Sequence, residues 1–134
     1  MPKKYKIAVA VLLVLTAGLL LHRFAWIHAP SDGEIIYLAP GTEEPIRVPL
    51  TQEDAVAVKS ILWGHIPWPE EIYGYPACAF DWYFSVTIDG VCYMPARCCG
   101  DMVVADGSDG ERRFMNVTEG QMENLIEIIS SAAE

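Results

Sequence analysis

The sequence predicts an α+β domain in which an antiparallel sheet carries two packed helices, in the order ββαββββα. One N-terminal transmembrane or signal-anchor helix precedes the domain. Three observations predict this fold: an apolar run near the N-terminus, alternating apolar residues around an Asp-Gly pair, and two amphipathic segments that begin with helix-capping residues. The 134 residues are enough for one modest domain and this appendage.

The N-terminal segment has the composition of a membrane span. Residues 7–21 form a continuous uncharged and mostly apolar run, which extends to Ile27 across His22 and Arg23. A long basic side chain near the end of a span can reach the interface, so these two residues do not end the run. Residues 7–27 therefore supply 21 positions, about the length that a bilayer needs, and we predict that they contact the membrane.

Three lysines among the first six residues set the predicted orientation, because positive charge stays on the cytoplasmic side. We predict a signal anchor or transmembrane helix over residues 1–28, a polar linker over 29–33 and an extracytoplasmic α+β domain over 34–134. The alternative is a cleaved signal peptide, which would make the domain secreted. The small residues that cleavage requires are poorly placed after the apolar run.

The first half of the domain predicts two strands and a helix. Strands are expected over 34–38 and 46–49, separated by a turn rich in Pro and Gly. Thr51 is placed to cap a helix over 52–63, and Gly64 is placed to end it.

A β-hairpin is the clearest local signal in the chain. Apolar and polar residues alternate over 80–88, which is typical of a strand with one buried face. The Asp-Gly pair at 89–90 favours a type I′ turn before a returning strand over 91–94. A two-residue loop pairs Ile88 with Val91.

The C-terminal part predicts two more strands and a second helix. Strands are expected over 102–105 and 111–115, joined by a glycine-rich turn that resembles a calcium loop only loosely. Thr118 begins the last helix, and Gln121 follows it at capping-box spacing.

The segment from Gly64 to Ala77 predicts a loop, because three prolines and two glycines oppose regular structure. Loops of this length inside a compact domain are often functional. We expect either a lid that packs its aromatic residues over the sheet or a recognition loop. The residues expected to contact a partner are Trp68, Glu70, Glu71, Tyr73 and Tyr75.

The charge distribution narrows the class of partner. Residues 29–134 contain all 18 acidic residues and five basic ones, which gives a formal charge of −13. Such a surface argues against nucleic acid and anionic lipid as ligands and suits a basic protein partner. It also serves solubility.

All four cysteines lie between positions 78 and 99, and export favours disulfides over metal binding. Their spacing lacks the paired CxxC motifs of a structural zinc site. Extending the hairpin register predicts a Cys78–Cys99 bridge, with Cys78–Cys98 as its main competitor. A second bridge, Cys92–Cys98, requires the chain to fold back after Met94.

The sequence carries no catalytic, cofactor or metal motif that we can identify. We therefore expect a membrane-anchored, extracytoplasmic binding module without catalysis, such as an immunity-type protein or an envelope factor. The alternative is a small exported hydrolase or thiol-dependent enzyme that uses Asp81, Asp101 and the cysteine end of the hairpin.

Overall fold

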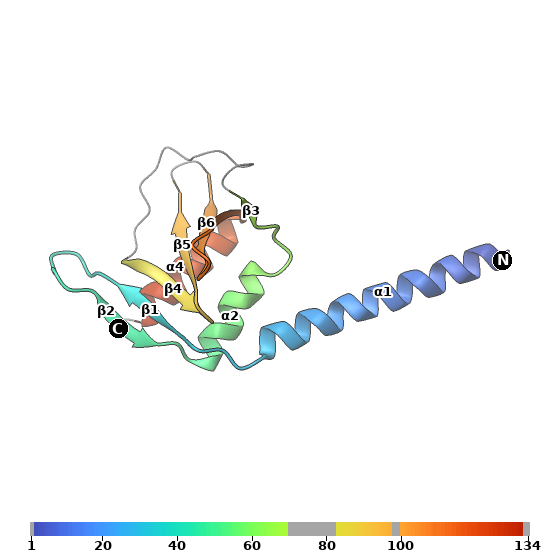
Figure 1. Cartoon of the computed structure of the whole chain (residues 1–134), viewed down its shortest axis with the longest axis horizontal. Helices are drawn as coiled ribbons and strands as arrows, with labels where there is room; N and C mark the ends of the chain where they lie inside the picture. The colour runs from blue at the N-terminus through green and yellow to red at the C-terminus, as the bar shows by residue number, and fades with distance from the viewer. Residues whose placement is uncertain (1, 70–82, 98–99, 133–134) are drawn as a thin grey trace.

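The structure, a computed structural model, describes residues 2–69, 83–97 and 100–132. Within these ranges the chain forms three helices and a seven-stranded antiparallel sheet, which confirms the predicted fold class (Figure 1). Along the chain the elements are α1 (Lys3–His28), β1 (Gly33–Tyr37), β2 (Ile46–Pro49), α2 (Gln52–Leu62), β3 (Trp68–Pro69), β4 (Phe84–Ile88), β5 (Val91–Ala96), β6 (Met102–Asp106), β7 (Arg112–Asn116) and α4 (Glu119–Ala132).

The sheet order is β2-β1-β4-β5-β6-β7-β3, so strands β4 to β7 form a meander that β1 and β2 extend at one edge. Strand β1 approaches β4 closely at Gly33. A Cβ at this position would lie 1.7 Å from the carbonyl oxygen of Thr87. Glycine is therefore needed where the linker enters the sheet.

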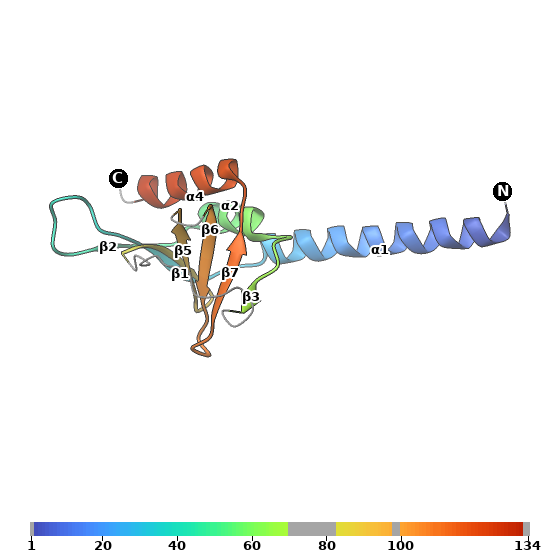
Figure 2. The same cartoon turned by 90° about the horizontal axis from the view of Figure 1, so that it is seen from above.

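Helices α2 and α4 lie on one face of the sheet (Figure 2). Each contributes an apolar stripe to a buried cluster that it shares with β1, β4, β6 and β7. The fully buried members from the two helices include Val58, Leu125 and Ile129, which face Ile35 and Val103 of the sheet. This cluster is the main core of the domain.

Part of the opposite face of the sheet is also buried, which corrects the prediction of a hairpin with one buried face. Ser85 is fully buried although it alternates with the core residues Phe84 and Val86. A second cluster joins three of the meander strands. Its fully buried members are Met94, Met102, Val104 and Phe114. Apolar residues on both sides of the central strands explain this burial.

The predicted turn and capping chemistry is present. Asp89 and Gly90 have φ angles of 49° and 86°, the positive values that a type I′ turn requires, and Ile88 pairs with Val91. Thr118 and Gln121 form a reciprocal capping box. The backbone amide of Gln121 donates to the Thr118 hydroxyl at 3.2 Å. The backbone amide of Thr118 donates to the side-chain oxygen of Gln121 at 3.0 Å.

Helix α1 extends away from the sheet as one continuous helix of 26 residues (Figures 1 and 2). Its apolar side chains are exposed along most of its length, and its most apolar window has no residue buried in the protein. It is long and apolar enough to be a membrane anchor or a signal sequence.

Candidate functional site

Trp68 lies on β3, a two-residue strand at one edge of the sheet. The prediction that Gly64–Ala77 lacks regular structure was wrong here, because Trp68 pairs with Phe114 and Pro69 pairs with Arg113. Proline is tolerated at an edge, where its missing amide need not donate to a neighbour. Trp68 faces the side of the sheet opposite the helices, since paired residues share a face, and 41% of it is exposed.

The other predicted contact residues, Glu70, Glu71, Tyr73 and Tyr75, lie outside the described residues. Ile66 precedes β3 and is 61% exposed. Together, Ile66 and Trp68 are the exposed large apolar side chains in the described part of the predicted loop.

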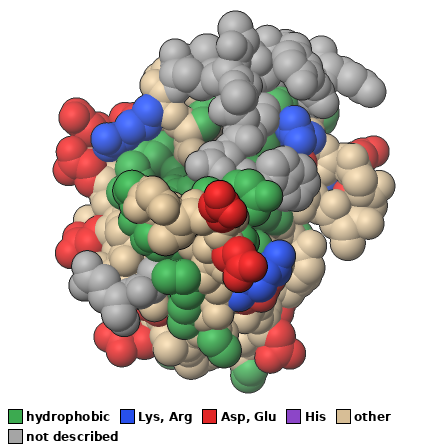
Figure 3. All heavy atoms as spheres, turned by 90° about the vertical axis from the view of Figure 1, so that its left-hand side faces the viewer, with side chains coloured by type: hydrophobic (Ala, Val, Ile, Leu, Met, Phe, Trp, Pro, Cys, Tyr) green, Lys and Arg blue, Asp and Glu red, His purple; other side chains and the backbone are tan. Residues whose placement is uncertain are grey.

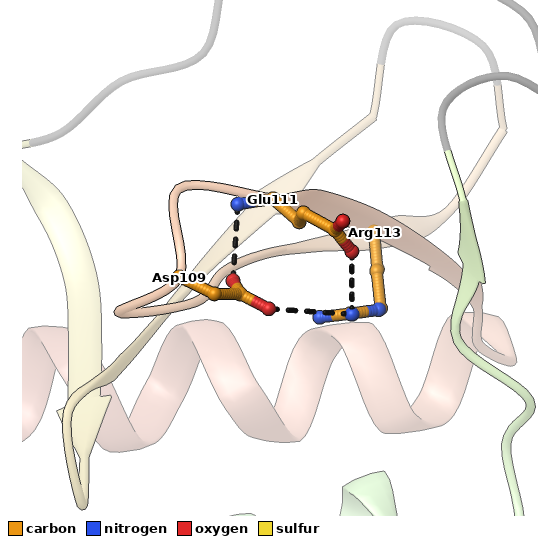
Figure 4. Close-up of polar contacts among 3 residues, drawn as sticks. All are labelled: Asp109, Glu111 and Arg113. Atoms are coloured by element: carbon orange, nitrogen blue, oxygen red, sulfur yellow. Dashed lines mark hydrogen bonds and ion pairs between the residues drawn. The ribbon is translucent and has the colours of Figure 1, made fainter.

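Charged residues of the β6–β7 hairpin adjoin β3. Arg113, opposite Pro69, forms ion pairs with Glu111 at 2.8 Å and Asp109 at 3.5 Å (Figure 4). The backbone amide of Glu111 donates to Asp109 at 3.0 Å and, together with Arg113, lowers the pKa of that carboxyl below its usual range. The carboxylate thus closes the turn with protein partners. Among the residues that the structure describes, no three acidic, His or Cys side chains gather to hold a metal ion.

The junction between α1 and α2 contains a feature that sequence reasoning missed. Lys59 of α2 is only 2% exposed, and its ammonium donates to the backbone oxygens of Trp26 and Ala29, each at 3.0 Å. Gln52 also donates to Ala29, at 3.2 Å. Two residues of α2 therefore hold the end of α1 and Ala29, the first residue of the predicted linker, against the domain.

Pro30 explains why Trp26 needs an outside donor. In a helix the Trp26 carbonyl would accept from the amide four residues later, which is Pro30 and has no N–H. The Lys59 ammonium supplies the missing donor. Pro30 is visible in the sequence, but only the fold reveals which side chain takes its place.

Two further contacts join α1 to α2. Ile27 is buried against the domain, and the Arg23 guanidinium lies 5.2 Å from the ring centroid of Trp63, within the range of a cation–π interaction. A groove of about 280 Å³ runs beside these contacts. Its lining combines apolar residues of α1 with Arg23, His28 and Ser60.

Asp101 is the residue of the enzyme alternative that the structure describes, and the thiol of Cys92 does not lie near it. Cys92 pairs with Asp106 at one end of the β5–β6 ladder, whereas Asp101 directly precedes the pair of Met102 with Ala96 at the other end. Four residues of extended chain separate these ends, about 13 Å. Asp101 forms an ion pair with Arg97 at 3.3 Å. Asp81 lies outside the described residues.

The structure bears on one of the two predicted disulfides, because Cys92 lies among the described residues. Cys92 is a free, half-buried thiol, so the Cys92–Cys98 bridge is not formed in the structure. Strand β5 stays paired through Ala96, and the chain therefore does not fold back after Met94 as that bridge requires. Cys78, Cys98 and Cys99 lie outside the described residues, and Cys78–Cys99 stays a prediction.

The two helices of the domain also border a groove. It has a volume of about 380 Å³ and is open to solvent between α2 and α4. Its lining is mixed, with Ser60, Gln121, Asn124 and Glu127 beside small and aliphatic residues. This polar, shallow lining lacks the enclosed apolar character of a small-molecule site.

Acidic side chains are dispersed rather than concentrated on the face opposite to the N-terminus of α1. Figure 3 shows them at several separate places among hydrophobic side chains.

Comparisons of the chain with protein-family models, curated proteins and solved structures found no match. The functional argument therefore relies on the geometry of this chain.

Proposed function

We propose that the chain is a membrane-anchored, non-catalytic binding module whose domain lies outside the cytoplasm. Three features support the anchor: the apolar surface of α1, the lysines that precede its apolar run, and a following region with a formal charge of −13. The Lys59 bonds hold the domain to the end of the anchor.

The exposure of Trp68 carries the proposal of binding. A lid would bury its aromatic residues, yet Trp68 is 41% exposed on an edge strand and belongs to neither core cluster. Tryptophan supplies a large contact area with few rotatable bonds, which favours its use in interfaces. A basic protein suits the charge of the domain, and an immunity-type role or an envelope assembly role would both provide such a partner.

Site-specific photo-crosslinking in native membranes tests this proposal. A photoreactive amino acid at position 68 should give a discrete crosslink to a basic protein, because Trp68 is exposed on a fixed strand. Position 46 is the matched control, since Ile46 is 42% exposed on the edge strand at the other end of the sheet. Equal crosslinking at both positions would contradict the proposal.

Replacement of the same residue separates recognition from packing. Trp68→Ala should abolish the complex with the partner, which is then detected with the photoreactive amino acid at another position. The free energy of unfolding should stay nearly unchanged. A loss of about 3 kcal/mol or more is typical of a buried aromatic and would show that Trp68 belongs to the core instead.

A further inference from the structure

The junction with α1 fixes the height of the domain above a membrane. Lys59 bonds the Trp26 and Ala29 carbonyls, and Ile27 is buried against the domain, so α2 is attached at the last turn of α1. The height of the domain depends on the proposed membrane anchorage of α1. If α1 spans the bilayer, these contacts also place α2 relative to the lipid.

Helix geometry gives the depth of the attachment. The apolar run begins at Ile7, and Arg23 follows 16 residues later, about 24 Å along the axis at 1.5 Å per residue. Trp26 lies about 28 Å from Ile7 by the same measure. A hydrocarbon core of about 30 Å therefore ends near Trp26, and Arg23 lies within one turn of that boundary.

The contact between Arg23 and Trp63 relates the position of the domain to this depth. Its ring centroid is 5.2 Å from the Arg23 guanidinium, which places the C-terminal end of α2 at the level of the outer interface. Tryptophan is enriched at this level because one end of its ring is apolar and the other is polar. The chain then continues from Trp63 into residues 64–67, which join α2 to β3.

The connection over residues 64–67 lies on the side of the domain from which α1 leaves. Figures 1 and 2 show it projecting in the direction of the N-terminus of α1 before the chain turns back into β3, and Figure 1 shows it separated from α1 itself. The His65 amide donates to Leu62 at 3.3 Å, and the His65 ring is hydrogen-bonded to Gln121 at 2.9 Å. These bonds hold the start of the connection against both domain helices.

Ile66 follows His65 and is 61% exposed. We propose that residues 64–67 form a second membrane contact beside α1, with Ile66 inserted into the outer interface of the lipid. The connection projects from the side of the domain that faces the proposed membrane, directly after Trp63, which contacts Arg23 of α1. This position is why lipid rather than another protein is the proposed occupant. This contact would keep the domain from tilting. It would also leave Trp68, on the side of the sheet opposite the helices, beside the bilayer surface.

The lipid chemistry follows from the charges. Residues 29–134 carry a formal charge of −13, so anionic headgroups would be repelled, and the contact must be apolar. Phosphatidylcholine alone should support it. Raising the salt concentration should leave it intact, because salt screens charge interactions and does not weaken apolar burial.

Depth-dependent fluorescence quenching tests the proposal. The full-length chain, with an environment-sensitive fluorescent amino acid at position 66, is reconstituted into phosphatidylcholine vesicles that contain lipid brominated near the headgroup end of the acyl chain. The same label at position 46 is the control, since Ile46 is also an exposed isoleucine and lies on the far edge strand from β3. Position 66 should be quenched several-fold more strongly than position 46, equally at low and high salt.

Equal quenching at the two positions would overturn the proposal. Flotation of the same vesicles on a density gradient, after washing at alkaline pH, reports the anchor separately. A chain that floats while position 66 stays unquenched contradicts the second contact and leaves the anchor supported. A chain that does not float contradicts both.

Discussion

Lys59→Met tests the junction between α1 and the domain. The substitution keeps an unbranched side chain of similar length and removes the ammonium that donates to Trp26 and Ala29. The Trp26 oxygen then loses its donor, because Pro30 has no amide to offer. The Ala29 oxygen keeps its bond from Gln52.

The magnitude follows from these two bonds. A hydrogen bond from a charged group contributes about 1.5–3 kcal/mol, and an orphaned buried acceptor costs about 1–3 kcal/mol. Burial of the Lys59 ammonium also costs free energy, because the charge loses its water. Lys59→Met removes this cost, which offsets part of the lost stability. With one of the two acceptors still bonded, we expect Lys59→Met to lower the free energy of unfolding by about 2 kcal/mol.

Urea denaturation of the full chain in detergent micelles, followed by near-ultraviolet circular dichroism, measures the loss. Arg47→Met is the matched control, because the Arg47 side chain is 60% exposed and its contact is one ion pair with Glu34 at 2.6 Å. Surface pairs contribute at most about 1 kcal/mol, so this variant should resemble the wild type. Equal midpoints for the two variants would refute the role of Lys59.

Three further predictions concern the domain itself. Burial, together with the charge of Asp89, raises the pKa of Tyr93, so its stabilising contribution is complete below about pH 10 and is lost as the pH rises through the raised value. Tyr93→Phe should therefore flatten the decline of stability above about pH 10 in urea titrations, and an unchanged slope would contradict this cause. Thr118→Ala removes a cap of α4 and should lower the free energy of unfolding by about 1 kcal/mol, with no change speaking against the capping box. Cys92 is half-buried and should be alkylated far more slowly in the native protein than in urea, whereas fast native reaction would favour the thiol-enzyme alternative.

Local signals predicted most of the elements. The capping residues Thr51 and Thr118 begin the two domain helices, and the Asp-Gly pair sets the β4–β5 register as expected. These features succeed because a few neighbouring residues satisfy backbone groups of the same segment. Both boundaries of α2 and the start of α4 therefore follow from the sequence to within about a residue.

Long-range partners were not predictable in this way. Strand β1 pairs with β4 across the intervening helix α2, and the short β3 pairs with β7 despite its proline. In the sequence Lys59 resembles an ordinary surface residue of an amphipathic helix. In the structure its amine donates to carbonyls that lie 33 and 30 residues earlier in the chain. Such contacts depend on which elements meet in space, and no local pattern encodes them. The proposed contact residue Trp68 was visible in the sequence, whereas the role of Lys59 at the junction with α1 was not.

The topology of the native protein tests the central claim most directly. A C-terminal tag on the full chain should be digested by protease added to right-side-out membrane vesicles, while a tag placed before Lys3 should resist until the membrane is opened. This result follows from the proposed orientation, in which the lysines stay inside and α1 spans the bilayer. A protected C-terminal tag together with an accessible N-terminal tag would contradict both the orientation of the anchor and the placement of the binding domain outside the cytoplasm.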